Sequence, residues 1–278
     1  MGQEVNFEEA LHSGLRSGRV LFTVAIIALG VETAAFANYV GFSGGFSPRY
    51  SVVPVLPWLP AGIPWLAYAF GTICVACATG LLFEHARRVS SAIFGGLLIL
   101  CTLILDLPKY ARQPDSMSLR TAVCEPLAIA ALAWLLPGRR VVPGWRTCTS
   151  RYLLMLCLIV FGVDHLIGLV PIAGLVPAWI PFHVFWTGFF GIAFIAAGVS
   201  IGLNIRRVWG AFGLGLMFAI WVLTLHLPRI LGLYGIAGAP RNPNEWSSLF
   251  IAIALWGGSW ALAGVEAFKN QKANGPTP

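Results

Sequence analysis

The chain has 278 residues, of which 58% are hydrophobic and only 10% are charged. A soluble domain has about 25% charged residues, so this composition excludes an ordinary soluble protein and predicts an all-α, polytopic membrane protein. The net charge of +7 is expected to come from basic cytoplasmic loops, and nucleic acid is not expected as a partner.

Long apolar runs predict eight transmembrane helices, since a helix needs about 20 apolar residues to cross the hydrocarbon layer. In chain order the runs cover 20–40, 63–83, 90–107, 121–136, 152–170, 182–203, 208–227 and 246–268. They divide the chain into a cytoplasmic N-terminal segment (1–19), a first four-helix repeat (20–137), a cytoplasmic linker (138–151), a second four-helix repeat (152–268) and a cytoplasmic tail (269–278). No clear cleavage pattern follows the first run, so no removed signal peptide is expected.

The basic residues predict the orientation in the membrane. With the N-terminus inside, the inner loops and tails hold twelve of the eighteen lysines and arginines. Because cytoplasmic loops are enriched in basic residues, both termini are expected on the cytoplasmic side of a bacterial-type inner membrane. Tryptophans on the expected outer side, such as Trp58, Trp65 and Trp179, suit the interface between lipid and water.

The two halves of the chain repeat each other at an offset of 119 to 121 residues. The matching motifs are Arg87-Arg88 with Arg206-Arg207, Asp106-Leu-Pro-Lys109 with His226-Leu-Pro-Arg229, and Glu125 with Glu245. Because each copy has an even number of spans, both copies have the same orientation. Two fused, parallel four-helix bundles are therefore predicted.

Ionisable residues inside a membrane span are costly and mark candidate functional positions. By the predicted spans, every acidic residue or histidine within a span, or at its edge, lies near the outer face. They are Glu32, Asp164 and His165 within spans, Asp106 and His226 at span ends, and Glu125, His183 and Glu245 at span starts. A proton-linked site open to the periplasm needs such a cluster, because buried charges must pair or reach water.

Some of these residues also have simpler interpretations. Glu125 and Glu245 suit helix starts, where the helix dipole favours an anion. In the Leu-Pro-Lys/Arg motif the proline is expected to end the helix, and Lys109 or Arg229 to interact with the freed carbonyls or with a lipid head group. Each basic residue follows Asp106 or His226 by three positions and is able to share a helix face with it.

We assign proton exchange to Asp164, with His165 and His226 as acceptor or relay groups, because imidazole titrates near physiological pH. Substrate binding is assigned to Glu32, Asp106, Arg229, Glu245, Trp179 and His183. The residues do not fix a cofactor, although histidine is able to hydrogen-bond a quinone carbonyl, and axial ligation of haem b by His165 and His226 stays open. No metal is assigned, because the candidate ligands lack short ligand spacing.

Motifs of the second copy resemble the DoxX-like family of four-helix membrane proteins, and the first copy fits more loosely. They are Phe161-Gly-Val-Asp-His165, Val176-Pro-Ala-Trp-Ile-Pro181, the span from Trp186 to Gly202, Arg206-Arg207 and His226-Leu-Pro-Arg229. That family includes membrane subunits linked to thiosulfate oxidation with quinone as acceptor. Other members support redox or stress systems or the assembly of membrane proteins. The resemblance implies a four-helix unit, here present twice.

Three functions follow as hypotheses. The first is a component of a quinone-linked redox system with an extracytoplasmic acid/histidine cluster. The second is a non-catalytic accessory or assembly subunit that binds other membrane proteins through small-residue helix faces. The third is a metal or small-solute transporter that uses the interface between repeats. The lipid bilayer is the expected partner in each, and whether the protein is an enzyme stays open.

Overall fold

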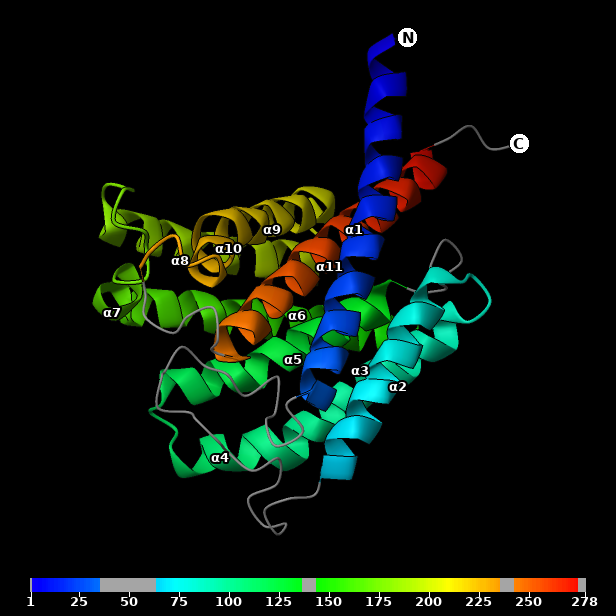
Figure 1. The fold of residues 1–278 in the computed structure, drawn as a ribbon. Helices are drawn as coiled ribbons and strands as arrows, with labels where there is room; N and C mark the ends of the chain where they lie inside the picture. The colour runs from blue at the N-terminus through cyan, green and yellow to red at the C-terminus, as the bar shows by residue number, and fades with distance from the viewer. Residues whose placement is uncertain (1, 36–63, 137–143, 236–242, 275–278) are drawn as a thin grey trace.

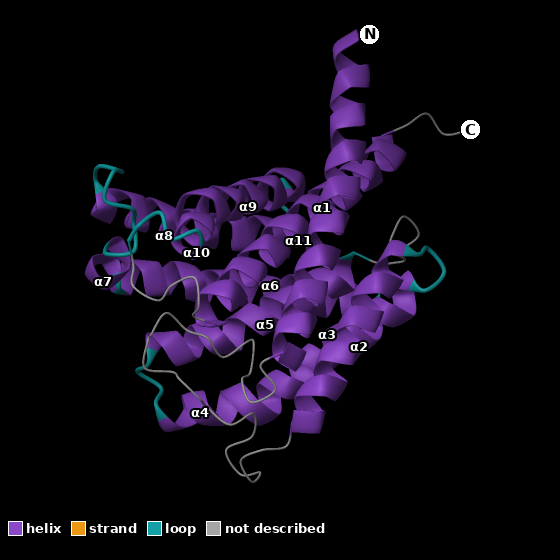
Figure 2. Cartoon of the chain, in the orientation of Figure 1, coloured by secondary structure: helices purple, strands orange, loops and turns teal. Residues whose placement is uncertain are grey.

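The computed structural model describes residues 2–35, 64–136, 144–235 and 243–274, and this part of the chain is helical, with no strand (Figure 2). Its long helices are α1 (Gly2–Ala35), α2 (Pro64–Leu82), α3 (Arg87–Cys101), α5 (Met117–Leu135), α6 (Trp145–Ile167), α8 (His183–Gly202), α9 (Arg207–Trp221) and α11 (Pro243–Asn274). Shorter pieces are the π-helical turns η1 (Thr102–Asp106) and η2 (Val222–His226), and helices α4 (Leu107–Arg112), α7 (Leu169–Ala173) and α10 (Leu227–Ile230). The predicted all-α class is confirmed.

Seven helical stretches among the described residues are long and apolar enough to cross a membrane. They are Arg16–Ala35, Arg87–Arg112, Met117–Leu135, Trp145–Ile167, His183–Gly202, Arg207–Ile230 and Asn244–Ala267. A shorter apolar stretch, Ala67–Leu82, makes up most of α2. The structure therefore supports a multi-pass membrane protein with seven of the eight predicted spans, and the eighth stays a prediction.

The outer surface of these helices carries large apolar side chains. Val24 of α1 is 55% exposed, Ile93 of α3 is 51% exposed and Ile192 of α8 is 62% exposed. Such a surface suits hydrocarbon, because a helix that is apolar all round is normally buried in protein or in lipid. Apart from its ends, a helix pairs its backbone N–H and C=O groups internally, as a lipid environment requires.

The long helices form a closed ring. Each packs against the next one along the chain, and the last, α11, returns to pack against α1. Helices α5 and α11 also contact each other across the ring. The start of α1 and the end of α11 lie at one end of the molecule, and α4, α7 and α10 lie away from them (Figure 1). We call the end with the start of α1 and the end of α11 the proximal end, and the opposite one the distal end.

Glycines allow the closest helix crossings. A Cβ on Gly18 of α1 would lie 2.5 Å from the backbone N of Ala261 and 2.7 Å from the carbonyl O of Gly257 on α11. A Cβ on Gly257 would in turn lie 2.5 Å from the backbone N of Phe22. Small residues of this kind let helix backbones approach closely in membranes, where van der Waals contact drives helix association. The crossing fixes α1 on α11.

The two Leu-Pro motifs lie within continuous helix, so the prediction that each proline ends its helix is wrong. Pro108 and Pro228 lie in the first turns of α4 and α10, directly after the π-helical turns η1 and η2. There the N–H of Leu107 donates to the carbonyl of Thr102, five residues back. A π-turn alters the backbone hydrogen-bond register, so a residue without an N–H is accommodated here and the chain stays helical.

Candidate functional site at the distal end

Several predicted site residues lie at helix ends on the distal side of the ring. Glu32 lies in the last turn of α1, Asp106 and His226 end η1 and η2, and Asp164 lies in the last turn of α6. These four side chains are deeply buried, with exposed fractions of 7%, 4%, 4% and 3% respectively. All four lie at distal helix ends but on different helix pairs, and their common place near the outer membrane face stays a prediction.

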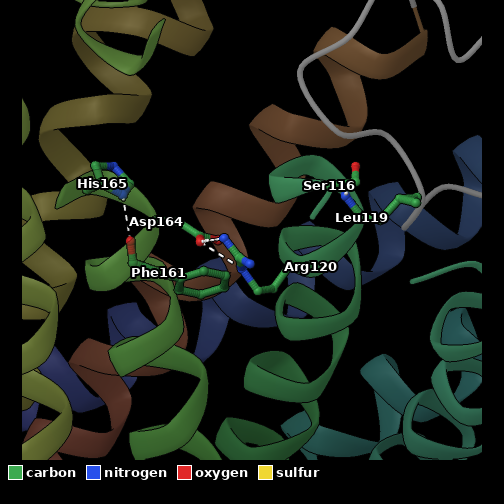
Figure 3. Close-up of polar contacts among 6 residues, drawn as sticks. All are labelled: Ser116, Leu119, Arg120, Phe161, Asp164 and His165. Atoms are coloured by element: carbon green, nitrogen blue, oxygen red, sulfur yellow. Dashed lines mark hydrogen bonds and ion pairs between the residues drawn. The ribbon is translucent and has the colours of Figure 1, made fainter. Parts of the chain in front are cut away.

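Asp164 is held by an arginine from the neighbouring helix. Its Oδ1 accepts a hydrogen bond from Arg120 Nε at 2.7 Å and a second from Nη2 of the same guanidinium (Figure 3). Arg120 lies in the first turn of α5, so the pair joins α5 to α6. The predicted span 121–136 begins one residue after Arg120 and misses the polar first turn of α5, so the sequence placed Arg120 in the preceding loop. The only available signal was its position directly before that run.

His165 follows Asp164 in α6 but points away from the ion pair (Figure 3). Its Nδ1 lies 2.7 Å from the carbonyl O of Phe161. Because a carbonyl oxygen only accepts hydrogen bonds, Nδ1 carries the proton and Nε2 is the nitrogen left for another partner. The imidazole stacks on Trp221 at the end of α9, with ring centroids 5.5 Å apart and an interplanar angle of 16°.

Aromatic rings from α8 and α9 pack against this imidazole and against each other. Phe194 of α8 lies 5.3 Å from the ring of His165 and 5.6 Å from that of Trp221. Phe190 and Phe218 also pack on Trp221, with centroid distances of 5.4 Å and 5.8 Å. Edge-to-face and stacked contacts of this kind stabilise aromatic clusters. His165 Nε2 is therefore a polar atom within a largely aromatic region formed by α6, α8 and α9.

His226, Arg229 and Glu245 form a second group. Arg229 donates two hydrogen bonds to the Glu245 carboxylate, from Nε to Oε2 at 2.8 Å and from Nη2 to Oε1. His226 lies within the electrostatic influence of both charges, and its Nδ1 has no hydrogen-bond partner among the described residues. Glu245 lies in the first turn of α11, as predicted. The group joins α10 to α11.

The corresponding region of the first half contains Asp106, Lys109 and Glu125. Lys109 Nζ lies 3.6 Å from Asp106 Oδ1, which confirms that these residues share a helix face. Glu125 does not begin its helix as predicted, because α5 starts at Met117 and Ser116 Oγ caps it by accepting from Leu119 N at 3.4 Å. Glu125 lies two turns further in, within the electrostatic influence of Asp106.

Glu32 is held by α11. Ser247 Oγ donates a hydrogen bond to Glu32 Oε1 at 2.7 Å, and both residues are buried. Ser247 is another contact that the sequence analysis missed, since a serine in an apolar run carries no signal of its own. The contact adds a polar link to the α1–α11 crossing.

Two predicted substrate-binding residues lie apart from these groups. Trp179 is 66% exposed, and its Nε1 donates to Tyr234 Oη at 3.3 Å. Tyr234 in turn donates to the carbonyl of Thr224. His183 begins α8, where its backbone carbonyl accepts a hydrogen bond from Thr187 Oγ1 at 3.0 Å. Among the described contacts, those of Trp179 and His183 are with Tyr234 and Thr187, and none is with a buried acid.

Six buried polar atoms at this end lack a hydrogen-bond partner within the described part of the chain. They are Glu32 Oε2, Asp106 Oδ1, Lys109 Nζ, Glu125 Oε2, Asp164 Oδ2 and His226 Nδ1, of which Asp106 Oδ1 and Lys109 Nζ form an ion pair at 3.6 Å. Leaving such an atom unsatisfied costs about 1–3 kcal/mol, so these atoms are suited to bind water or a polar ligand. In the same described residues, no group of three or more histidine, cysteine or acidic side chains is placed to hold a metal ion.

Glu266 contradicts the prediction that every acidic residue or histidine within a span lies near the same face. It is 1% exposed in the proximal part of α11, where Arg207 Nε lies 2.6 Å and Arg151 Nη2 3.4 Å from its carboxylate. Glu266 falls within the apolar run 246–268 but at its inner end, so it is an exception to the predicted gathering of acids near the outer face. Its burial is tolerated because two guanidinium groups pair with it.

Comparison with known proteins gives no match to a protein-family model, a curated protein or a solved structure. The DoxX-like resemblance therefore stays a prediction from the sequence.

Proposed function

We propose that this protein is a membrane component of a quinone-linked redox system that binds a quinone beside His165. The observation that carries the proposal is the imidazole stacked on Trp221, whose Nδ1 is fixed by the Phe161 carbonyl. Among the described residues Nε2 has no hydrogen-bond partner. A quinone has a flat ring that stacks on aromatic side chains and two carbonyl oxygens that accept hydrogen bonds. The site offers both kinds of contact.

Proton exchange follows from the same groups. Reduction of a quinone to a quinol takes up two electrons and two protons, so a quinone site needs a group that exchanges protons near each carbonyl. Protonated His165 donates from Nε2 to the quinone oxygen, and neutral His165 accepts from the quinol hydroxyl. Asp164, the preceding residue, has a buried Oδ2 that lacks a hydrogen-bond partner among the described residues. The electrons come from another protein or substrate, which fits the predicted association with membrane protein subunits.

We also propose that the chain consists of two copies of a DoxX-like four-helix unit. Segments α3, η1 and α4 begin at residues 87, 102 and 107, and α9, η2 and α10 begin at 207, 222 and 227, each 120 residues later. In this register Arg87 corresponds to Arg207, a shift of one residue from the predicted match with Arg206. The shared π-helical turn before a Leu-Pro pair supports a common origin.

Close contacts repeat as well, at an offset of 120 residues for Gly71, Gly80 and Ser90, and of 132 residues for Gly30 on the first helix. Gly30 meets Gly71 between α1 and α2, and Gly162 meets Gly191 between α6 and α8. Gly80 packs on Ser90 in the first half, while in the second half the contact of Ser200 with Gly210 reverses the two residue types. Helix α1 packs on α11, and α6 packs on α5. In the proposed repeat, the fourth helix of each copy therefore packs on the first helix of the other.

We place the distal end outside a bacterial-type inner membrane and both termini in the cytoplasm, with α2 as the eighth span. Support comes from the basic residues at proximal helix ends, which include Arg87, Arg88, Arg146, Arg151 and Arg206. Cytoplasmic ends of membrane helices carry such an excess of arginine and lysine. The distal site then faces the periplasm.

Quinone binding to the purified protein in lipid nanodiscs tests the proposal. A short-chain ubiquinone analogue is titrated, and binding is followed by calorimetry and by quenching of tryptophan fluorescence. His165→Phe keeps an aromatic ring on Trp221 but removes Nε2, so about tenfold weaker binding is expected for the loss of one hydrogen bond. His85→Phe, at an exposed histidine between α2 and α3, is the matched control. Wild-type protein that binds no quinone, or equal binding by His165→Phe, would contradict the proposal.

An accessory role is the second candidate. It is favoured by the pairing of distal acids inside the chain, with Asp164 on Arg120 and Glu245 on Arg229. In this role the charges fix neighbouring helices, and the protein supports another membrane protein without binding a quinone. Purification in mild detergent distinguishes the two candidates. A stable stoichiometric partner together with absent quinone binding would favour the accessory role.

A further inference from the structure

The proximal end contains a buried carboxylate paired with two arginines from different helices. Glu266 of α11 is 1% exposed, Arg207 Nε of α9 lies 2.6 Å from its Oε2, and Arg151 Nη2 of α6 lies 3.4 Å from its Oε1. Two guanidinium charges face one carboxylate, so these three side chains together carry a net charge of +1. This arginine pair, Arg151 and Arg207 around Glu266, is distinct from the distal site.

The two arginines are held differently. Arg207 is fixed through Nε to Glu266 and through Nη1 to Asn204 Oδ1. Arg151 contacts Glu266 through Nη2 alone and at a longer distance. A guanidinium has five N–H donors, so Arg151 keeps donors for a further acceptor. The side chain of Arg151 is 21% exposed and that of Arg207 is 18% exposed, so part of each remains at the protein surface.

Neighbouring aromatic residues indicate the depth of the pair in the membrane. Tyr152 follows Arg151 and is 49% exposed, and Trp209, two residues after Arg207, is 63% exposed. Exposed tyrosine and tryptophan are enriched at the level of the lipid head groups. Arg206, which precedes Arg207, is exposed as well. The arginine pair therefore lies at the depth where lipid phosphates lie.

We propose that Arg151 and Arg207 form a binding site for the phosphate of an anionic lipid. Arginine matches phosphate with two parallel hydrogen bonds, and the net positive charge favours an anionic lipid over a zwitterionic one. Basic residues between helices at a membrane surface bind anionic head groups by this chemistry. The inference does not rest on quinone binding at the distal end.

The counterpart of Arg207 in the first half is held differently. Arg87, which occupies the place of Arg207 in the proposed repeat, donates from Nε to the carbonyl of Leu81 at 2.9 Å and from Nη2 to that of Leu82 at 3.4 Å. The guanidinium of Arg87 thus caps the C-terminal end of α2. The residue as a whole is only 6% exposed. Because Arg87 is used to cap α2, only Arg207 of these two corresponding arginines is expected to contribute to a lipid site.

Thermal unfolding of the full-length protein in detergent tests the site. Unfolding is followed by tryptophan fluorescence with added phosphatidylglycerol, phosphatidylcholine or inorganic phosphate. Phosphatidylglycerol should raise the midpoint by mass action, and phosphatidylcholine at the same mole fraction should raise it less. Arg151→Gln should weaken phosphatidylglycerol binding about fivefold, the effect of one basic residue near an anionic surface. Arg88→Gln, at an exposed arginine of the same end, should bind like the wild type.

Glu266→Gln gives a test of opposite sign. It removes the negative charge and leaves both arginines, so the lipid-free midpoint should fall while phosphatidylglycerol binding becomes about fivefold tighter. Native mass spectrometry measures the bound lipid independently of unfolding, which covers a variant of low stability. Equal lipid binding by Arg151→Gln and the wild type, or weaker binding by Glu266→Gln, would overturn the proposal. Stabilisation by inorganic phosphate without a preference for lipid would also overturn it, because the site would then bind free phosphate.

Discussion

Removal of Arg120 is expected to destabilise the protein more than removal of its partner Asp164. The two side chains differ in exposure, since that of Asp164 is 4% exposed and that of Arg120 is 25% exposed. Arg120→Gln leaves a carboxylate buried between α5 and α6 without its cation. Asp164→Asn leaves a guanidinium whose long side chain is able to move toward water or lipid head groups at the distal end.

The expected magnitudes follow from this asymmetry. Removing one partner of a buried ion pair costs about 3–5 kcal/mol, because the remaining charge is uncompensated. The partial exposure of the pair places Arg120→Gln at about 3 kcal/mol, the lower limit of that range. Asp164→Asn loses charge-assisted hydrogen bonds but buries no charge, so about 1 kcal/mol is expected. The double variant Arg120→Gln/Asp164→Asn should recover most of the larger loss.

Unfolding in mixed micelles with increasing denaturing detergent measures these free energies, with tryptophan fluorescence as the signal. The four proteins of the double-mutant cycle are compared under the same conditions. A loss for Asp164→Asn as large as that for Arg120→Gln would refute the argument from burial. Additive losses in the double variant would show that the two side chains are not coupled.

Three further predictions concern packing, ion-pair geometry and accessibility. Gly257→Ala should destabilise the protein by about 2 kcal/mol, because the added Cβ would meet the backbone of α1. The control Gly213→Ala, whose Cβ would have no atom within 4 Å, should be neutral or slightly stabilising in the same unfolding assay. Arg229→Lys should cost about 1 kcal/mol, because an ammonium cannot make the paired hydrogen bonds to the carboxylate of α11. Cys148 is exposed and should react rapidly with a maleimide, while Cys74, 1% exposed, should react only after unfolding, as mass spectrometry would show.

The helices could be predicted because their signal is local. A membrane helix needs only sufficient length and few charges, so the apolar run 182–203 predicts α8 (His183–Gly202) closely. The run 121–136 predicts α5 less well, since Ser118 and Arg120 make its first turn polar. Helix ends are thus least predictable where a polar first turn lies at the membrane surface, which is also where the site residues lie.

The partners of the buried acids could not be predicted, because they depend on which helices become neighbours. Asp164 and Arg120 are 44 residues apart, and Glu32 and Ser247 are 215 residues apart. Sequence position gives the depth of a residue in the membrane, but it does not give the direction in which its helix faces. Residues at equal depth were therefore expected to form one cluster, whereas the structure places them in separate contacts around the ring.

These separate contacts correspond to each other in the proposed repeat. Asp164 belongs to the first helix of the second copy and meets Arg120 on the fourth helix of the first copy. Glu32 belongs to the first helix of the first copy and meets Ser247 on the fourth helix of the second copy. The same type of interface thus holds a buried carboxylate twice, once with a cation and once with a hydroxyl. Because a hydroxyl donates a hydrogen bond but brings no charge, the two interfaces differ in electrostatics while sharing a scaffold, as expected for duplicated units that have acquired different roles.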